Sequence, residues 1–129
     1  MKKEDKLLLL KELCMRLPYG VICSTPKGNG HLCSINQTIF GNEYGVNIEA
    51  TMRDYFDDNK CDIKPYLRPM SSMTEEEKKI YDDILTKMYY DEKSTLGDIS
   101  DYLNSIHVDY RGLIERGLAI AVNENNNPY

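Results

Sequence analysis

Apolar residues near the start of the chain recur at helical spacing. Within residues 5–17 they form a stripe of Leu7, Leu10, Cys14 and Leu17, which Leu9 and Leu13 widen. We expect Asp5 to cap this helix and Pro18 to end it, because proline disfavours helical geometry at the residue before it. The pattern predicts a helix that packs on a sheet through this stripe.

From residue 20 the pattern changes to short segments rich in β-branched residues. GVICS, HLCSINQTIF and YGVNIEA are separated by PKGNG and GNEY, which are typical turn sequences. They predict a three-stranded antiparallel meander with one buried face. TMRDYFDDNK is polar and has no clear period, and CDIKPY is compatible with a short fourth strand at the sheet edge that ends before Pro65.

Residues 74–77 predict the start of a helix. Thr74 and Glu77 match a capping box, and Glu75 and Glu76 place negative charge at the positive end of the helix dipole. The prolines of KPYLRP fix an extended approach to this start. The apolar stripe that follows consists of Ile80, Ile84, Leu85 and Met88.

The rest of the chain predicts two shorter helices after a polar break at DEKST. Residues 97–107 should bury Ile99, Tyr102, Leu103 and Ile106. VDYRGLIERG predicts a last short helix with Gly117 just past its end, and AIAV either adds a strand or packs. We therefore predict one α+β domain over residues 1–122, in which a meander of three to four strands packs against an N-terminal helix and C-terminal helices, and a disordered tail over 123–129.

Charge and hydropathy exclude several classes of partner. With 16 basic and 21 acidic residues the net charge is −5, which disfavours nucleic acid and anionic membranes. The apolar run of residues 7–10 is shorter than the about 7–15 residues of a secretory signal, and no stretch reaches the about 18 needed to span a bilayer. We expect a cytoplasmic protein whose four cysteines stay reduced.

The first predicted hairpin contains possible metal ligands. If its turn is centred on PKGNG, Cys23 and Cys33 lie opposite each other and His31 shares their face. A zinc site needs a fourth ligand, which would have to come from Cys61, His107 or a distant carboxylate. We favour buried thiols and predict no metal and no cofactor, although the sequence leaves this site open.

Catalytic residues are not predicted. His107, Asp109 and Arg111 are close in sequence, but no nucleophile elbow, phosphate loop or metalloprotease motif accompanies them. Ser71, Ser72 and Thr74 precede a Glu-rich helix start, where main-chain capping explains them better than nucleophilic or phosphorylation chemistry. We therefore expect a protein that is not an enzyme.

Tyrosine is unusually frequent, with ten Tyr, two Phe and no Trp. Tyrosine and arginine are favoured in protein interfaces, which makes Tyr66, Arg68, Tyr110 and Arg111 the predicted binding patch. The alternative is that these rings are half-buried and cover neighbouring Pro and Arg side chains.

Three blocks, LPYGV, KPYLRPMSSMTEEEK and DYRGLIERGLA, resemble a family of small uncharacterised proteins from gut anaerobic bacteria, their prophages and mobile elements. The resemblance implies an origin and no activity. With the residues above, it favours a non-catalytic accessory protein that acts through a protein partner or by self-association. The alternative is a small-molecule or nucleotide-binding module that interferes with host defence signalling.

Overall fold

Six strands and three α-helices make up the described part of the chain, residues 2–37, 43–49, 52–57, 61–91 and 96–129 of a computed structural model. The strands are β1 (Ile22–Thr25), β2 (Gly28–Gln37), β3 (Tyr44–Ile48), β4 (Met52–Phe56), β5 (Lys64–Leu67) and β6 (Ile120–Ala121). The helices are α1 (Lys3–Arg16), α2 (Glu75–Thr86) and α3 (Leu96–Ser105), with 3-10 turns at Leu17–Tyr19 and Met70–Ser72 and a π-helical stretch at Lys87–Asp91.

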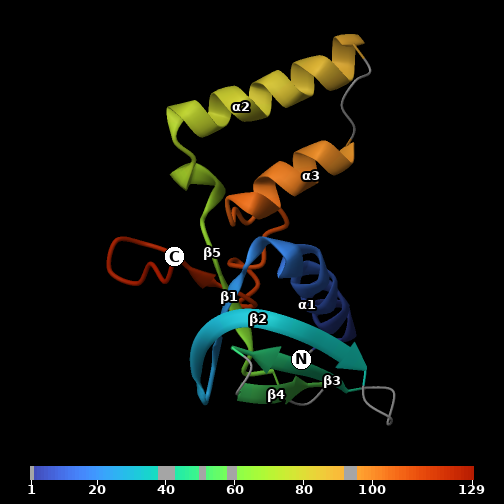
Figure 1. The fold of residues 1–129 in the computed structure, drawn as a ribbon, viewed down its shortest axis with the longest axis vertical. Coiled ribbons are helices and arrows are strands. Elements are labelled where there is room, and N and C mark those ends of the chain that lie inside the picture. The colour runs from blue at the N-terminus through green and yellow to red at the C-terminus, as the bar shows by residue number, and fades with distance from the viewer. Residues whose placement is uncertain (1, 38–42, 50–51, 58–60, 92–95) are drawn as a thin grey trace.

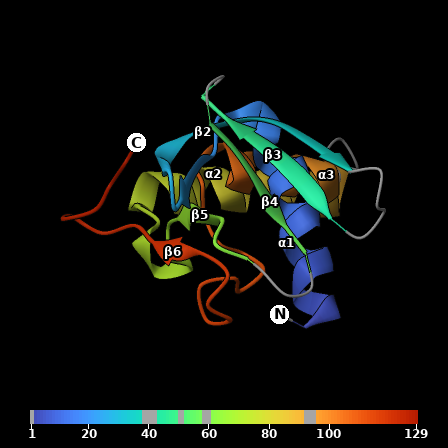
Figure 2. The same cartoon turned by 90° about the horizontal axis from the view of Figure 1, so that it is seen from below.

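All six strands belong to one sheet in the order β4-β3-β2-β1-β5-β6. Helix α1 lies against one face of this sheet, while α2 and α3 form a hairpin that projects away from it (Figure 1). Figure 2 shows the same arrangement from below, with α1 beneath β2, β3 and β4. The α+β class is confirmed, but the predicted three to four strands were too few.

The polar segment TMRDYFDDNK, to which no element was assigned from the sequence, contains β4, which continues the meander. It pairs antiparallel with β3, and its inward positions are Asp54 and Phe56. The next strand, β5, was predicted to lie at the sheet edge. This prediction is wrong, because β5 pairs antiparallel with β1 on one side and parallel with β6 on the other. Pro65 does not end this pairing: it lies opposite Cys23, and its missing N–H breaks no bond to β6, whose register begins at Tyr66.

The first hairpin turns earlier than predicted. Thr25 pairs with Gly28, so the turn consists of Pro26 and Lys27 instead of being centred on PKGNG. The Thr25 hydroxyl accepts a hydrogen bond from the Lys27 amide and donates one to the Gly28 carbonyl, which closes the turn. Gly28 has a φ of 137°, a conformation that favours glycine. The last residues of the predicted second strand, 38–40, lie outside the described residues.

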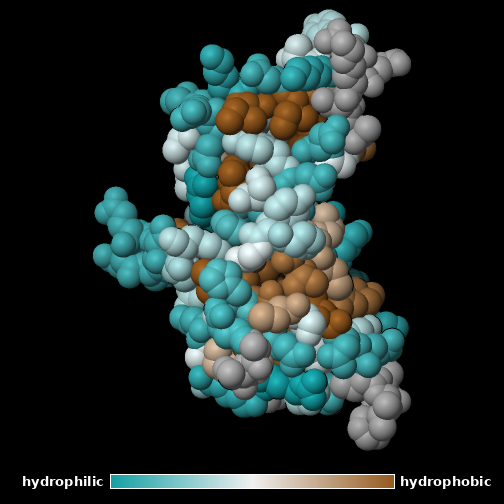
Figure 3. All heavy atoms as spheres, viewed as in Figure 1, coloured by the Kyte–Doolittle hydropathy of each residue, from teal (hydrophilic) through white to brown (hydrophobic). Residues whose placement is uncertain are grey.

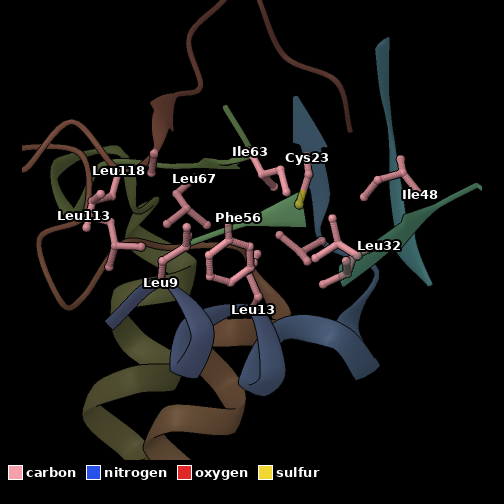
Figure 4. Close-up of a cluster of buried hydrophobic side chains, with 13 residues drawn as sticks. Leu9, Leu13, Cys23, Leu32, Ile48, Phe56, Ile63, Leu67, Leu113 and Leu118 are labelled. Atoms are coloured by element: carbon pink, nitrogen blue, oxygen red, sulfur yellow. The ribbon is translucent and has the colours of Figure 1, made fainter. Parts of the chain in front are cut away.

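The predicted apolar stripe of α1 is confirmed for Leu9 and Leu13 and, as partly buried residues, for Leu10 and Leu17, but it is wrong for Leu7 and Cys14. Leu9 and Leu13 are fully buried and point into the main core with Phe56 and Leu67 (Figure 4), whereas Leu7 is 51% exposed. Cys14 is also exposed. The helix begins at Lys3, and no side chain caps it. The buried face of α1 also includes the charged residues Glu12 and Arg16.

The capping box at the start of α2 is confirmed: the Thr74 side chain accepts from the Glu77 amide, and the Glu77 side chain accepts from the Thr74 amide. The predicted stripe of α2 is less covered than expected, since no residue of α2 is buried and Ile80 is 40% exposed. Helix α3 agrees with its prediction within a few residues. It buries Leu103 in a second, smaller cluster, and Ile99, Tyr102 and Ile106 pack against that cluster.

The predicted last helix over 108–117 is wrong, because these residues form turns. The buried carboxylate of Asp109 accepts from the amides of Leu113 and Ile114 at 2.9 Å, which closes a loop and not a helix. Gly117 has a φ of 72° at the end of this loop, so its predicted left-handed conformation is confirmed. AIAV supplies β6.

The segment predicted to be a disordered tail follows a defined path in the structure. Its first turn is held by Asn123, whose side chain accepts from the amides of Asn125 and Asn126. At its end the Tyr129 hydroxyl accepts from the Ile22 amide and donates to the Tyr66 carbonyl. The tail thus reaches β1 and β5. Within the described residues, no helix combines the length and apolar character that a membrane span requires.

Candidate functional site

Arg68 follows β5 and joins the sheet to the helical hairpin. Its Nη1 and Nη2 donate to the two carboxylate oxygens of Glu77 at 2.8 and 2.7 Å. Nε and Nη2 also donate to the hydroxyl and carbonyl of Ser72, and Nη1 to the carbonyl of Ile106. Each guanidinium N–H group therefore has an acceptor. Arg68 acts as an internal clamp between β5 and α2.

This clamp changes the acidity of Glu77. Its hydrogen bonds from Arg68 lower the pKa of the Glu77 carboxyl to about 2 against the opposing effect of burial, and the Thr74 amide adds to the shift. The hydroxyls nearby also have main-chain partners: Thr74 accepts from the Glu77 amide, and Ser72 donates to the carbonyl of Pro69 at 2.6 Å. The capping role expected for Thr74 is confirmed, Ser72 binds a main-chain carbonyl within the 3-10 turn, and the role of Ser71 stays a prediction.

Tyr110 and Arg111, the other half of the predicted patch, lie together against α1. Two guanidinium groups approach the Tyr110 ring, with Cζ of Arg16 5.4 Å and Cζ of Arg111 5.6 Å from its centroid. Both distances are in the range of cation–π contacts. Arg111 Nε is 3.1 Å from Oε1 of Glu12, an ionic contact whose angles are not those of a hydrogen bond.

Glu12 and Arg16 are the charged residues on the buried face of α1. Both side chains are fully buried, and Arg16 Nε donates to Glu12 Oε2 at 2.7 Å. Arg16 Nη2 donates to the carbonyl of Val108 at 2.7 Å, which connects α1 to the segment after α3. A buried ion pair needs such additional partners, because it loses its hydration. The Arg16 Nη1 and the Tyr110 hydroxyl, also buried, have no hydrogen-bond partner among the described residues.

The sequence reading missed this pair. The available signal was the i, i+4 spacing of Glu12 and Arg16 directly beside Leu9 and Leu13, which places two opposite charges on one strongly apolar face. Exposed ion pairs with this spacing are common on helix surfaces, so the spacing alone does not show burial.

Tyr66, on β5 two residues before Arg68, has contacts of its own. Its hydroxyl accepts from the Asn29 side chain at 3.0 Å, and its carbonyl accepts from the Tyr129 hydroxyl. The structure therefore brings Tyr110 and Arg111 together, while it places Arg68 in the Glu77 clamp and Tyr66 beside Asn29 of β2. That these four residues form one binding patch stays a prediction.

His107, just after the end of α3, has a strained backbone and a strongly lowered pKa. Its backbone is left-handed, with a φ of 61°, and its ring stacks on Tyr129 with centroids 3.8 Å apart. Burial, followed by the positive charges of Arg16 and Arg68, lowers the pKa of His107 to about 4. The imidazole is therefore neutral near pH 7. Its buried Nδ1 has no hydrogen-bond partner among the described residues.

His107, Asp109 and Arg111, which are close in sequence, make separate contacts in the structure. Asp109 binds two main-chain amides, and Arg111 contacts Glu12. Neither is hydrogen-bonded to His107 in any described contact. A general base requires a reacting proton within hydrogen-bond reach, and no described hydroxyl or thiol is hydrogen-bonded to the His107 ring.

The possible metal ligands of the first hairpin are also apart. Cys23 lies opposite Gly30, not opposite Cys33, because the turn comes earlier than the sequence suggested. Cys23 is buried, which raises the pKa of its thiol to about 12, whereas Cys33 is exposed. His31 Nδ1 contacts Glu49 Oε1 at 2.8 Å. Across the described ranges, no three His, Cys, Asp or Glu side chains gather as a metal site would require.

Three of the hollows on the described surface lie in different parts of the fold. One of about 300 Å³ is lined by residues of the 69–71 and 109–115 segments, including Ser71 and Glu115. Another of about 300 Å³ is bordered by Cys61, Lys64 and the ion pair between Asp5 and Arg116. The third, of about 420 Å³, lies at the free end of the helical hairpin and is lined by Leu85, Thr86, Met88, Tyr89 and Tyr90.

The chain matches no protein-family model, no curated protein and no solved structure. Function therefore has to be argued from the chain itself. Arg16 joins α1 to Val108, and Arg68 joins the end of β5 to α2. The most exposed tyrosines of the described residues, Tyr89 and Tyr90, lie on the hairpin.

Proposed function

We propose that this protein is a non-catalytic interaction protein that acts by binding another protein in the cytoplasm. Following the resemblance of its flanking blocks, we further propose that it belongs to a bacterial mobile element or phage-like region. The observation that carries the interaction proposal is the set of large apolar side chains left exposed on the hairpin: Ile80, Tyr89, Tyr90 and Leu96.

These large apolar side chains are more exposed than such residues usually are on a protein surface. Tyr89 and Tyr90 are 79% and 75% exposed, and Leu96 is 73% exposed. Tyrosines rank among the residues that contribute most to protein interfaces, because they bury a large area at a small loss of conformational entropy. In contrast, the ionisable groups that chemistry would need are held in internal contacts, as for Arg68 and Glu12.

Native mass spectrometry and size-exclusion chromatography test the proposal together. The purified chain, prepared without chelator, is added to a lysate of its own host, and its elution volume is compared with that in buffer. We expect a shift to larger size in the lysate, and a mass spectrum of the purified protein without a bound small molecule or zinc.

A matched pair of variants shows whether the hairpin is involved. The double variant Tyr89→Ser/Tyr90→Ser should lose the shift, whereas Tyr55→Ser on β4, also partly exposed, should retain it. An unchanged elution volume for the unmodified protein would contradict the proposal. A stoichiometric small molecule in the native spectrum would instead support the ligand-binding alternative.

A further inference from the structure

The free end of the helical hairpin is the least covered apolar part of the described molecule. The hollow of about 420 Å³ lies here, between the last turn of α2 and the π-helical stretch that follows it. The rings of Tyr89 and Tyr90 meet edge to face, with centroids 5.0 Å apart. Leu96, at the start of α3, is exposed close by in the chain. We call Leu85–Tyr90 together with Leu96 the hairpin tip.

The tip is exposed because α2 has a single helical neighbour. Helix α3 lies between α2 and the rest of the molecule (Figure 1), and Tyr81 of α2 packs against the small cluster of Met73, Leu103 and Val108. In Figure 3 the apolar atoms over α2 lie below a row of hydrophilic ones and are separate from the larger apolar patch lower on the same face. The apolar atoms over α2, with polar residues beside them, have the composition of an interface core with a polar rim.

The exposed charge of the helical hairpin as a whole is predominantly acidic. In residues 75–90 and 96–105, six acidic side chains are exposed against three lysines, and Glu77 is neutralised by Arg68. The acidic residues are Glu75, Glu76, Asp82, Asp83, Asp98 and Asp101, and the basic ones are Lys78, Lys79 and Lys87. The exposed part of the hairpin thus has a net charge of −3, out of −5 for the whole chain.

This charge decides between the possible occupants. A second copy would bring an equally acidic hairpin against the first, and like charges across an interface oppose association. Nucleic acids and anionic membranes are repelled for the same reason. A partner with basic residues around an apolar centre complements both features of the tip.

The edge of the sheet offers a less suitable docking surface. On the outer side of β4, Lys27 Nζ donates to the carbonyl of Arg53, and the carboxylate of Asp54 accepts from the amide of Tyr55. Side chains that occupy edge groups in this way hinder the addition of another strand. Strand pairing with a partner is therefore disfavoured at this edge.

We propose that the hairpin tip docks a basic amphipathic segment of a partner protein. The apolar side of that segment fills the hollow beside Tyr89 and Tyr90, and its lysines or arginines pair with carboxylates such as those of Asp82 and Asp83. The two tyrosine rings also offer π faces to a cationic group. This inference rests on the proposed function and adds to it the place of binding and the chemistry of the partner.

A synthetic peptide serves as the probe: a helix of leucine and lysine of about 14 residues, or roughly four turns. Its binding to the full chain is measured by calorimetry at two salt concentrations and mapped by amide chemical shifts. The comparison peptide has glutamate in place of every lysine. We expect binding of the lysine peptide only, weaker at high salt, with the largest shifts at the hairpin tip.

Three variants locate the binding site. Tyr89→Ser/Tyr90→Ser should weaken the lysine peptide by about tenfold or more, and Asp82→Asn/Asp83→Asn should reduce the salt dependence. Tyr55→Ser is the matched control and should bind like the unmodified protein. All three should retain the amide spectrum of a folded chain, because the altered side chains lie outside both cores.

Equal binding of the glutamate peptide, shifts centred away from the tip, or a dimer in sedimentation that the Tyr89/Tyr90 variant abolishes would overturn this inference. If peptide binding is absent from the tip but the host lysate still shifts the protein, the inference fails and the proposed function stands. If the lysate produces no shift although the peptide binds at the tip, the proposed function fails.

Discussion

The sheet with α1 and the α2–α3 hairpin are built on different principles. The sheet half has a continuous core in which thirteen residues are buried, among them Leu9, Leu13 and Phe56. The hairpin has a cluster of three buried residues, Met73, Leu103 and Val108, and none of them belongs to α2. The sheet with α1 therefore supplies most of the stability of the fold. The hairpin contributes little to it, so its side chains can stay exposed with a small loss of folding free energy.

Two charged clusters join these halves, and they are not equivalent. The pair of Glu12 and Arg16 is fully buried and connects α1 to Val108. The pair of Arg68 and Glu77 is partly exposed and attaches the start of α2 to the end of β5. Removing one partner should therefore cost more in the first cluster than in the second.

The largest effect is expected from Glu12→Gln. It leaves the buried guanidinium of Arg16 without its negative partner, which should lower the free energy of unfolding by about 3–5 kcal/mol. Urea denaturation at pH 7 measures the loss. Glu4→Gln, an exposed change on the same helix, is the control and should have little effect. Equal stability of the two variants would mean that the buried pair does not stabilise the junction.

Leu13→Ala and Ile84→Ala compare the two cores directly. The first removes a fully buried side chain from the main core and should cost about 3 kcal/mol. The second removes a half-buried side chain of α2 and should cost about 1 kcal/mol. Denaturation midpoints at equal m-value measure both losses. A larger loss for Ile84→Ala would reverse the proposed division between the halves.

Glu77→Gln tests the clamp and its pH dependence. The pKa of Glu77 in the folded chain, about 2, is below its ordinary value of 4.5, so its contribution is complete above pH 4.5 and is lost as the pH falls toward 2. At pH 7 the variant should be less stable by about 2 kcal/mol. This difference from the unmodified protein should shrink between pH 4.5 and 2. A constant difference over that range would contradict the assignment.

His107→Asn tests the neutral histidine at the junction. Asparagine tolerates the left-handed backbone at this position. The pKa of His107 is lowered from 6.5 to about 4 in the folded chain, so protonation favours unfolding, and stability is lost as the pH falls from 6.5 to 4. Because the ring is partly exposed, we expect a loss of about 1 kcal/mol over this window. The slope of stability against pH should be smaller in the variant, while a steeper slope would exclude this role for His107.

The smallest effect is expected from Tyr90→Ser. Its ring is exposed and belongs to neither core, so the free energy of unfolding should change by less than about 0.5 kcal/mol. Thermal denaturation measures this change alongside Phe56→Ala, which should unfold at a markedly lower temperature. A loss of stability comparable to that of Phe56→Ala would show that the hairpin tip is part of the fold and not a free surface.

Local patterns predicted those elements whose formation depends on neighbours in the sequence. The capping box of Thr74 and Glu77, the helix around Leu103 and the left-handed Gly117 agree with the structure. The same reasoning failed over 108–117, where helical spacing suggested a helix. The carboxylate of Asp109 binds two amides there and closes a loop instead, an outcome that apolar spacing does not reveal.

The candidate sites were less predictable, since a site depends on which segments meet. The predicted patch of Tyr66, Arg68, Tyr110 and Arg111 was drawn from residue type, but the acceptors of Arg68 come from three separate segments. The exposure of Tyr89 and Tyr90 also has no local signature, because it results from the absence of a neighbour beside α2.

By itself the sequence determined the α+β class, the helix start at Thr74 and the acidic charge of residues 75–105, because capping, apolar period and net charge are properties of nearby residues. The tertiary structure alone decided that α1 turns Glu12 and Arg16 inward, that β5 lies inside the sheet, and that α2 stays largely uncovered. These outcomes depend on contacts between segments far apart in the chain, such as Arg16 with Val108 and Glu12 with Arg111, and the spacing of residues along one segment carries no record of them.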